Sequence, residues 1–328
     1  AQKVSRGMTE PPAWAYAITP PPPPGAPRPA PEPEDKEPKR IPGATQAFTV
    51  AQIEDLRSPA DWFPGDHPAM PPIVATGRQP GVRACAYCHY PNGKGRPSNG
   101  GVSGQPVSYF IQTLNDFKNG LRKPGDPRKT NVNQMINFAK AMSPEEMRQA
   151  AEYFASIRWT QWVRVVESRT VPKAEAEGSI FFRKAGNETE PIGMRVIEMP
   201  EDNEQTEPLR NPRSGFVAYV PPGSIKKGEA LVTKGGNGRT VRCTVCHGED
   251  LNGAGPVPGI AGRSPSYLGR QMYDFQAGTR RGEWAEMMKP VVEHLTNDDL
   301  VAIVAYVSSR PMPPGPGGPP ARQSAGVR

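Results

Sequence analysis

Two stretches of the chain carry apolar residues at helical spacing directly after a sequence that caps a helix. Residues 143–146 read Ser-Pro-Glu-Glu, which supplies an N-cap, a proline at the first helical position and a capping-box acid. Residues 296–299 read Thr-Asn-Asp-Asp, the same arrangement with aspartate. Apolar residues follow at 147, 150, 151 and 154, and at 300, 303, 304 and 307. The pattern predicts one helix after each cap.

Other parts of the chain favour extended structure. Residues 162–166, 194–197 and 215–220 are rich in β-branched and aromatic residues, which predicts short strands. A polar, acidic run at 201–207 separates the last two. We therefore interpret residues 161–224 as an ordered connector with a few short strands.

Proline marks both ends of the chain. There are 42 prolines in 328 residues, about 13%, against a usual share of about 5%. Residues 1–68 and 311–328 are predicted to be extended, proline-rich arms that cannot bury a core of their own. The first arm nevertheless contains large aromatic residues that would anchor it on this chain or on a partner; these are Trp14, Tyr16, Phe48, Trp62 and Phe63.

The four cysteines form two identical motifs. Cys85 and Cys88 are followed by His89, and Cys243 and Cys246 are followed by His247. C-x-x-C-H is the attachment signature of c-type haem, in which two thiols join the porphyrin and the histidine binds iron. The sequence therefore predicts two covalently bound haem c groups.

Paired cysteines also occur in zinc sites and in redox disulfides. Zinc ribbons place their pairs roughly 15–20 residues apart, whereas these motifs are 158 residues apart. A redox disulfide of the thioredoxin type needs a βαβ context, which neither motif shows. Both alternatives fit less well than haem.

The two motifs belong to an internal repeat. Tyr109 and Tyr267 share the 158-residue offset of the cysteines, while Met135 and Met288 are offset by 153. The first copy therefore carries a five-residue insertion, which we place at 123–129. A repeat of this length indicates two domains of one fold rather than a solenoid.

These motifs resemble the tandem two-haem class I cytochromes c, over residues 70–160 and 225–310. The resemblance implies a mainly α fold with two such domains in tandem, at 69–160 and 225–310. It also implies that Met135 and Met288, in the loop before the last helix of each domain, are the sixth iron ligands. Met287 adjoins Met288, and the repeat register selects Met288.

The resemblance suggests further residues around each haem. A carbonyl in a P-x-[LI]-x-G segment accepts a hydrogen bond from the iron-binding histidine, and Pro258 to Gly262 matches that segment. The first copy has Gly100 to Gly104 instead. Tyr109 and Tyr267 either line the haem or are ordinary core residues. Bis-histidine ligation of the first haem by His67 is the alternative to Met135.

Charge and composition limit the classes of partner that the chain is expected to bind. The net charge is +7, but no Lys/Arg run reaches the 5–8 residues typical of a nucleic-acid patch. No apolar run approaches the roughly 18 residues of a membrane span. Residues 81–160 hold 11 Lys/Arg and 5 Asp/Glu, so we expect the first haem domain to dock an acidic redox partner.

The preferred function is single-electron transfer in a bacterial periplasm. Covalent haem attachment requires that compartment, and the N-terminus resembles that of a mature protein after signal-peptide removal. The expected donor is a periplasmic dehydrogenase, with this chain as its electron-accepting subunit, and the acceptor is an oxidase or another cytochrome. The alternative is a dihaem enzyme, either a peroxidase or one that oxidises a small sulfur compound.

Overall fold

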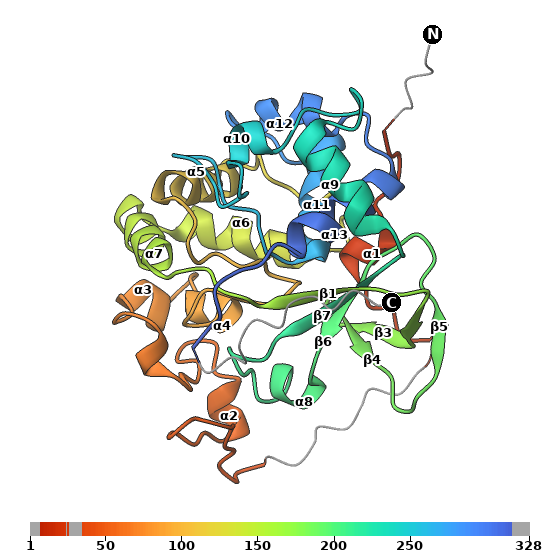
Figure 1. Cartoon of the computed structure of the whole chain (residues 1–328). Helices are drawn as coiled ribbons and strands as arrows, with labels where there is room; N and C mark the ends of the chain where they lie inside the picture. Colours follow the sequence, from red (N-terminus) through yellow and green to blue (C-terminus); the bar gives the residue numbers. More distant parts are fainter. Residues whose placement is uncertain (1–6, 24, 26–34, 317–328) are drawn as a thin grey trace.

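The computed structural model describes residues 7–23, 25 and 35–316. Within them lie thirteen α-helices and seven β-strands, so the fold is mainly helical with some short strands, as predicted. Figure 1 shows two groups of helices side by side, with the strands below the second group.

The first helical group follows the first arm. It consists of α3 (Pro72–Ala75), α4 (Cys85–His89), α5 (Val107–Lys118), α6 (Asn131–Ala141) and α7 (Pro144–Ser156). The predicted cap of α7 is present, because the Ser143 side chain accepts from the Glu146 backbone and the Glu146 side chain accepts from that of Ser143. Phe154 of α7 is fully buried at the centre of this group's core.

The second group repeats the first. It consists of α9 (Ser224–Lys234), α10 (Thr244–His247), α11 (Pro265–Gln276), α12 (Ala285–Val292) and α13 (Asn297–Ser308). Thr296 and Asp299 form the predicted capping box of α13. The buried residues of α13 run all round the helix, because it packs against α9, α11 and the strand layer.

One glycine sets the distance between α9 and α13. A Cβ on Gly228 would lie 1.9 Å from the carbonyl oxygen of Ala302. A side chain of any size would therefore push the two helices apart.

The connector forms the strand layer. Its strands are β1 (Val163–Glu167), β2 (Thr170–Pro172), β3 (Ala174–Glu177), β4 (Ile180–Arg183), β5 (Thr189–Pro191), β6 (Ile197–Pro200) and β7 (Phe216–Val220). β7 is central in a three-stranded sheet, parallel to β1 and antiparallel to β6. β2 pairs with β5, and β3 with β4.

The strands β1 and β7 lie within a residue of their predicted positions, whereas the strand predicted at 194–197 does not. The expected strand at 194–197 is displaced to Ile197–Pro200, where all four residues are buried and pair with β7. Met194 is 47% exposed and lies outside the sheet. The acidic run contains a short helix, α8 (Asn203–Thr206), capped by Asp202.

The described part of the first arm packs against the rest of this chain. It contains α1 (Ala13–Tyr16), α2 (Val50–Ile53) and a 3-10 turn (Pro64–Asp66). The indole of Trp14 donates to Asn297 Oδ1 (2.8 Å), and that of Trp62 donates to the Leu209 carbonyl (2.8 Å). These two indoles therefore anchor the arm on this chain, which is one of the two predicted alternatives.

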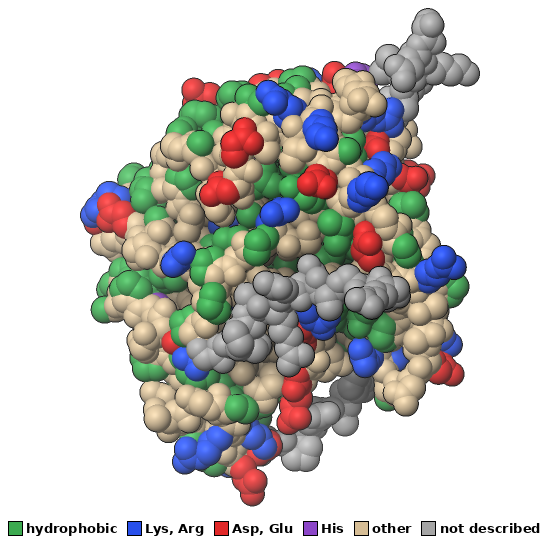
Figure 2. All heavy atoms as spheres, in the orientation of Figure 1, with side chains coloured by type: hydrophobic (Ala, Val, Ile, Leu, Met, Phe, Trp, Pro, Cys, Tyr) green, Lys and Arg blue, Asp and Glu red, His purple; other side chains and the backbone are tan. Residues whose placement is uncertain are grey.

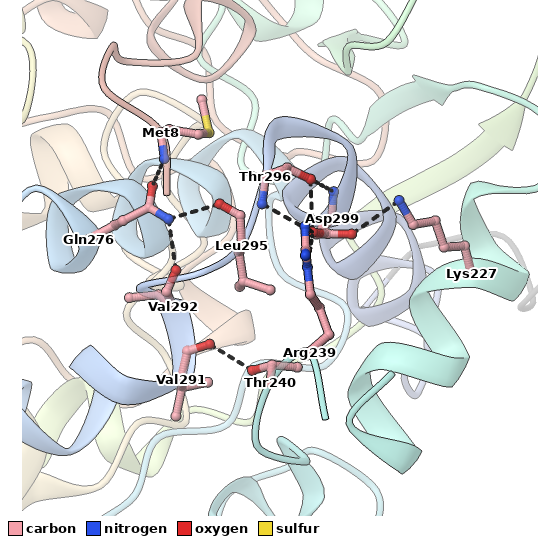
Figure 3. A network of polar contacts seen from close by, with 10 residues as sticks. All are labelled: Met8, Lys227, Arg239, Thr240, Gln276, Val291, Val292, Leu295, Thr296 and Asp299. Atoms are coloured by element: carbon pink, nitrogen blue, oxygen red, sulfur yellow. Dashed lines mark hydrogen bonds and ion pairs between the residues drawn. The ribbon is translucent and has the colours of Figure 1, made fainter. Parts of the chain in front are cut away.

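A polar network fastens the arm and the second helical group together (Figure 3). Gln276 of α11 accepts from the Met8 backbone and donates to the carbonyls of Val292 and Leu295. Asp299 of α13 pairs with Arg239 (2.9 Å) and with Lys227 of α9 (3.1 Å). The network joins α9, α11, α12 and α13 around the second motif.

Candidate haem sites

Each C-x-x-C-H motif forms a single helical turn. Cys85, Cys88 and His89 lie on α4. Cys243 is the N-cap of α10, and Cys246 and His247 lie within that helix. No disulfide pairs any of the four cysteines. The motifs therefore present two thiols and one imidazole from one turn, as haem attachment requires.

Both motif histidines donate to a backbone carbonyl. Nδ1 of His247 lies 2.8 Å from the Pro258 oxygen, and Nδ1 of His89 lies 3.2 Å from the Gly100 oxygen. Burial lowers the pKa of both imidazoles, and the carbonyl bond only partly opposes this effect. A neutral ring that holds its proton on Nδ1 leaves Nε2 free to bind a metal.

A continuous cavity of about 450 Å³ connects the two motifs. His89 and Met135 line it from the first domain, and His247 and Met288 line it from the second. The structure thus brings together one histidine and one methionine from each repeat around one cavity.

The expected loop position of the methionines is wrong. Met135 lies within α6, and Met288 lies within α12. Apolar residues at 132, 135, 136 and 139 follow helical spacing. Pro290 lies inside α12. Because proline is unfavourable in a helix interior, the sequence did not predict this helix.

The two tyrosines meet arginines that sequence reasoning missed. Arg280 donates to the hydroxyl of Tyr109 (2.9 Å), and Arg122 donates to that of Tyr267 (3.0 Å). Each pair crosses from one domain to the other. Burial acts to raise the pKa of Tyr109, but Arg280 and Arg122 outweigh it and lower that pKa to about 8. The two arginines are also 158 residues apart, the offset of the cysteine motifs, and this shared offset is the feature of the sequence that marks them as repeated residues.

The polar groups of the cavity fit haem c. A haem brings two carboxylates on an otherwise apolar macrocycle, and buried carboxylates require cationic partners. Lys129 lines the cavity, is 1% exposed, and its Nζ has no hydrogen-bond partner among the described residues. Burial lowers its pKa well below the usual value. Arg122, which is 7% exposed, also lines the cavity, and these two side chains would hold a propionate, whose negative charge would favour the protonated lysine.

His67 lies away from this cavity. Its Nε2 pairs with Asp61 (3.2 Å), and its Nδ1 lies 2.9 Å from the Pro68 carbonyl oxygen. Since both ring nitrogens have protein partners and the ring does not line the cavity, the structure gives no support to bis-histidine ligation.

Comparison with known proteins decides the family. The Cytochrome c family model matches residues 74–158 and 225–311. The chain belongs to the cytochrome c family. It is a dihaem cytochrome c, with one haem c attached at Cys85 and Cys88 and another at Cys243 and Cys246. It is an electron carrier of that type.

Two curated relatives match both domains of this cytochrome. A thiosulfate dehydrogenase electron acceptor of Stutzerimonas stutzeri is 30% identical, over 71% of this chain and 82% of the relative. Cytochrome c4 of Azotobacter vinelandii is 23% identical, over 71% of this chain and 87% of the relative. The crystal structure of cytochrome c4 from Pseudomonas stutzeri matches 69% of this chain and 93% of its own, with 20% identity and a TM-score of 0.45. Among the described residues, no helix has the length and apolar character to cross a membrane.

Proposed function

We propose that this cytochrome accepts single electrons from a periplasmic dehydrogenase and passes them to an oxidase or another cytochrome. The iron ligands are His89 with Met135 in the first domain, and His247 with Met288 in the second. The observation that carries this proposal is that one buried, neutral histidine and one methionine of each repeat line the same cavity.

The residues of each pocket have separate roles. A bound haem c supplies a one-electron Fe(III)/Fe(II) couple, so that the donor loses one electron and the acceptor gains it. The carbonyls of Gly100 and Pro258 orient the imidazoles. A neutral thioether favours the ferrous state and raises the potential. A methionine at each site also leaves no open position for a substrate, which argues against the dihaem-enzyme alternative.

A relative's name supports the choice of donor. The Stutzerimonas stutzeri relative is called a thiosulfate dehydrogenase electron acceptor, and so is a second relative from Thiomonas intermedia, which matches 78% of this chain. We therefore assign a dehydrogenase as donor and this chain as its electron-accepting subunit.

The predicted basic docking face is smaller than the sequence count indicates. Lys94, Arg122 and Lys129 of the first domain are buried. Arg210 of the connector lies 4.2 Å from the Tyr87 ring, beside Cys88, and covers the first motif. The burial of these three side chains leaves less charged surface on the first domain than residues 81–160 indicated, and Arg210 adds one cation beside the first motif.

The second motif is more open. On the outer face of α10, Val245 is 60% exposed and does not line the haem cavity, whereas Val241, Trp284 and Met287 do line it. Figure 2 shows hydrophobic and charged side chains interspersed where Figure 1 places α10 and α12. We assign electron exchange with the partner to this face.

Absorption spectra of methionine variants test the ligand set. In Met135→Ala and Met288→Ala, the weak long-wavelength band of ferric Met-ligated haem should lose about half its intensity, and it should vanish in the double variant. Each single variant should also gain carbon monoxide binding at one haem. Met287→Ala is the matched control and should keep the full band. An unchanged band in either ligand variant would refute that methionine as a ligand.

A further inference from the structure

The carbonyl segments that hold the two histidines meet at the domain interface. Gly100 precedes Gly101 in the first segment, and Pro258 precedes Gly259 in the second. One side chain, that of Arg263, bonds to both segments. Its Nε donates to the Gly259 oxygen (2.6 Å), and its Nη1 donates to the Gly101 oxygen (3.1 Å).

Arg263 is held by three backbone carbonyls and an aromatic ring. Nη2 donates to the Ser103 oxygen (3.0 Å), and the guanidinium carbon lies 4.3 Å from the centre of the Trp159 ring. The residue is 4% exposed and lines the cavity that contains both motif histidines. Among the described residues it forms no ion pair with a carboxylate, and its partners are carbonyls and an aromatic ring.

The repeat shows that this charge is specific to the second copy. Gln105 lies 158 residues before Arg263 and makes the reciprocal contact, donating to the Gly259 oxygen (3.2 Å). The two positions face each other across the interface, and only one of them is cationic. Interface packing alone therefore does not require the arginine, since an amide serves in the equivalent place.

We propose that Arg263 is a positioning residue shared by both haems, whose buried charge raises the reduction potential of both. The proposal deepens the proposed function, since it requires His89 and His247 as iron ligands. The guanidinium is one residue removed from each carbonyl that accepts a histidine proton. The guanidinium draws electron density from both segments, which weakens the hydrogen bonds that their carbonyls accept from the imidazoles. Both imidazoles then donate less electron density to the iron.

The electrostatic effect has the same sign. A positive charge near a haem favours the state that carries the extra electron. In a buried site such a charge is poorly screened, so one cation acts on both centres. Arginine suits this position because it stays protonated where a buried lysine would lose its proton.

The test is spectroelectrochemical titration of the holoprotein with Arg263→Gln. At a fixed applied potential, the ratio of oxidised to reduced haem should rise at least tenfold at both centres, which corresponds to a midpoint lower by about 59 mV for a one-electron couple. Lys226→Gln removes an exposed charge from α9 and should leave both midpoints in place. A shift at one haem alone, or at neither, would overturn the proposal.

Arg263→Lys keeps the proposal testable if the glutamine variant does not fold. A buried lysine loses its charge in an accessible pH range, so both midpoints should fall together as the pH rises. Tyr109 and Tyr267 are the titratable groups that act on Arg263, and the wild-type protein controls for them because it contains both. Parallel pH profiles in variant and wild type would refute a shared charge. Failure of the proposed ligand set would be recognised separately, as a missing Met-ligation band in the wild-type spectrum.

Discussion

Replacing Tyr16 with phenylalanine should loosen the first arm from the second domain. The Tyr16 side chain is 1% exposed, and its hydroxyl donates to Oδ1 of Asp274 at 2.8 Å. The same oxygen accepts from the Gly125 backbone at 2.7 Å. Asp274 is itself 4% exposed, so water cannot readily replace the lost donor.

The expected cost follows from the charge on the acceptor. A hydrogen bond to a charged group contributes roughly 1.5–3 kcal/mol, and one between neutral groups about 1 kcal/mol. We expect Tyr16→Phe to lower the free energy of unfolding by about 2 kcal/mol at neutral pH. For a chain of this size, that corresponds to a fall in melting temperature of roughly 4 °C.

The cost should depend on pH in a defined direction. Burial raises the pKa of Asp274, and the bonds from Tyr16 and Gly125 only partly oppose this. Because the folded-state pKa lies above the unfolded one, this carboxyl favours the folded state at low pH, and that contribution is lost as the pH rises. The variant raises the folded pKa further, so its deficit should grow with pH and shrink towards acid.

Urea unfolding of the ferric holoprotein at several pH values measures both effects. The control is Tyr90→Phe, because the Tyr90 hydroxyl is buried and has no hydrogen-bond partner among the described residues. That variant should be as stable as the wild type or slightly more so. If both variants lost the same stability, or if the Tyr16→Phe deficit did not grow with pH, the reasoning would be refuted.

Two further predictions concern packing and pH. Gly228→Ala should destabilise the second domain by roughly 1–3 kcal/mol, since its Cβ would lie 1.9 Å from the Ala302 oxygen; thermal unfolding measures this, and Gly65→Ala, whose Cβ would meet nothing within 4 Å, should be neutral. Burial acts to lower the pKa of His67, but the bond with Asp61, the Pro68 carbonyl and the charges of Asp61 and Asp66 together outweigh this and raise the pKa. The ion pair therefore stabilises the fold below the usual histidine pKa of about 6.5 and loses this effect at higher pH. His67→Gln should cost stability in acid urea titrations and little in alkaline ones.

Local signals in the sequence predicted the parts of the fold that local physics determines. The caps at Ser143 and Thr296 depend on residues three apart, and both appear where expected. The strand at 216–220 is a mostly buried run of β-branched and aromatic residues, the strand at 163–167 is a partly buried run that contains three valines, and both were also predicted. The C-x-x-C-H motifs needed no structure, because the attachment chemistry fixes their spacing.

Contacts between distant segments could not be predicted in the same way. The hairpin strand β3 alternates between exposed and half-buried residues, so it lacks the apolar run that marks a strand. The pairings of Arg122 with Tyr267 and of Arg280 with Tyr109 depend on how two domains dock. The two arginines share the 158-residue offset, which was not noticed in the sequence, and only the docked structure shows what they contact.

The two copies of the repeat differ in the distance between the iron-binding histidine and its carbonyl partner. Two identical pockets would hold an electron equally well and would give its movement no direction. The His247 bond to its carbonyl is shorter than that of His89, 2.8 against 3.2 Å, and a stronger bond makes the imidazole more basic and favours the ferric state. Arg263 acts on both sites and does not remove this difference. We therefore expect this difference to favour the electron on the first haem relative to the second.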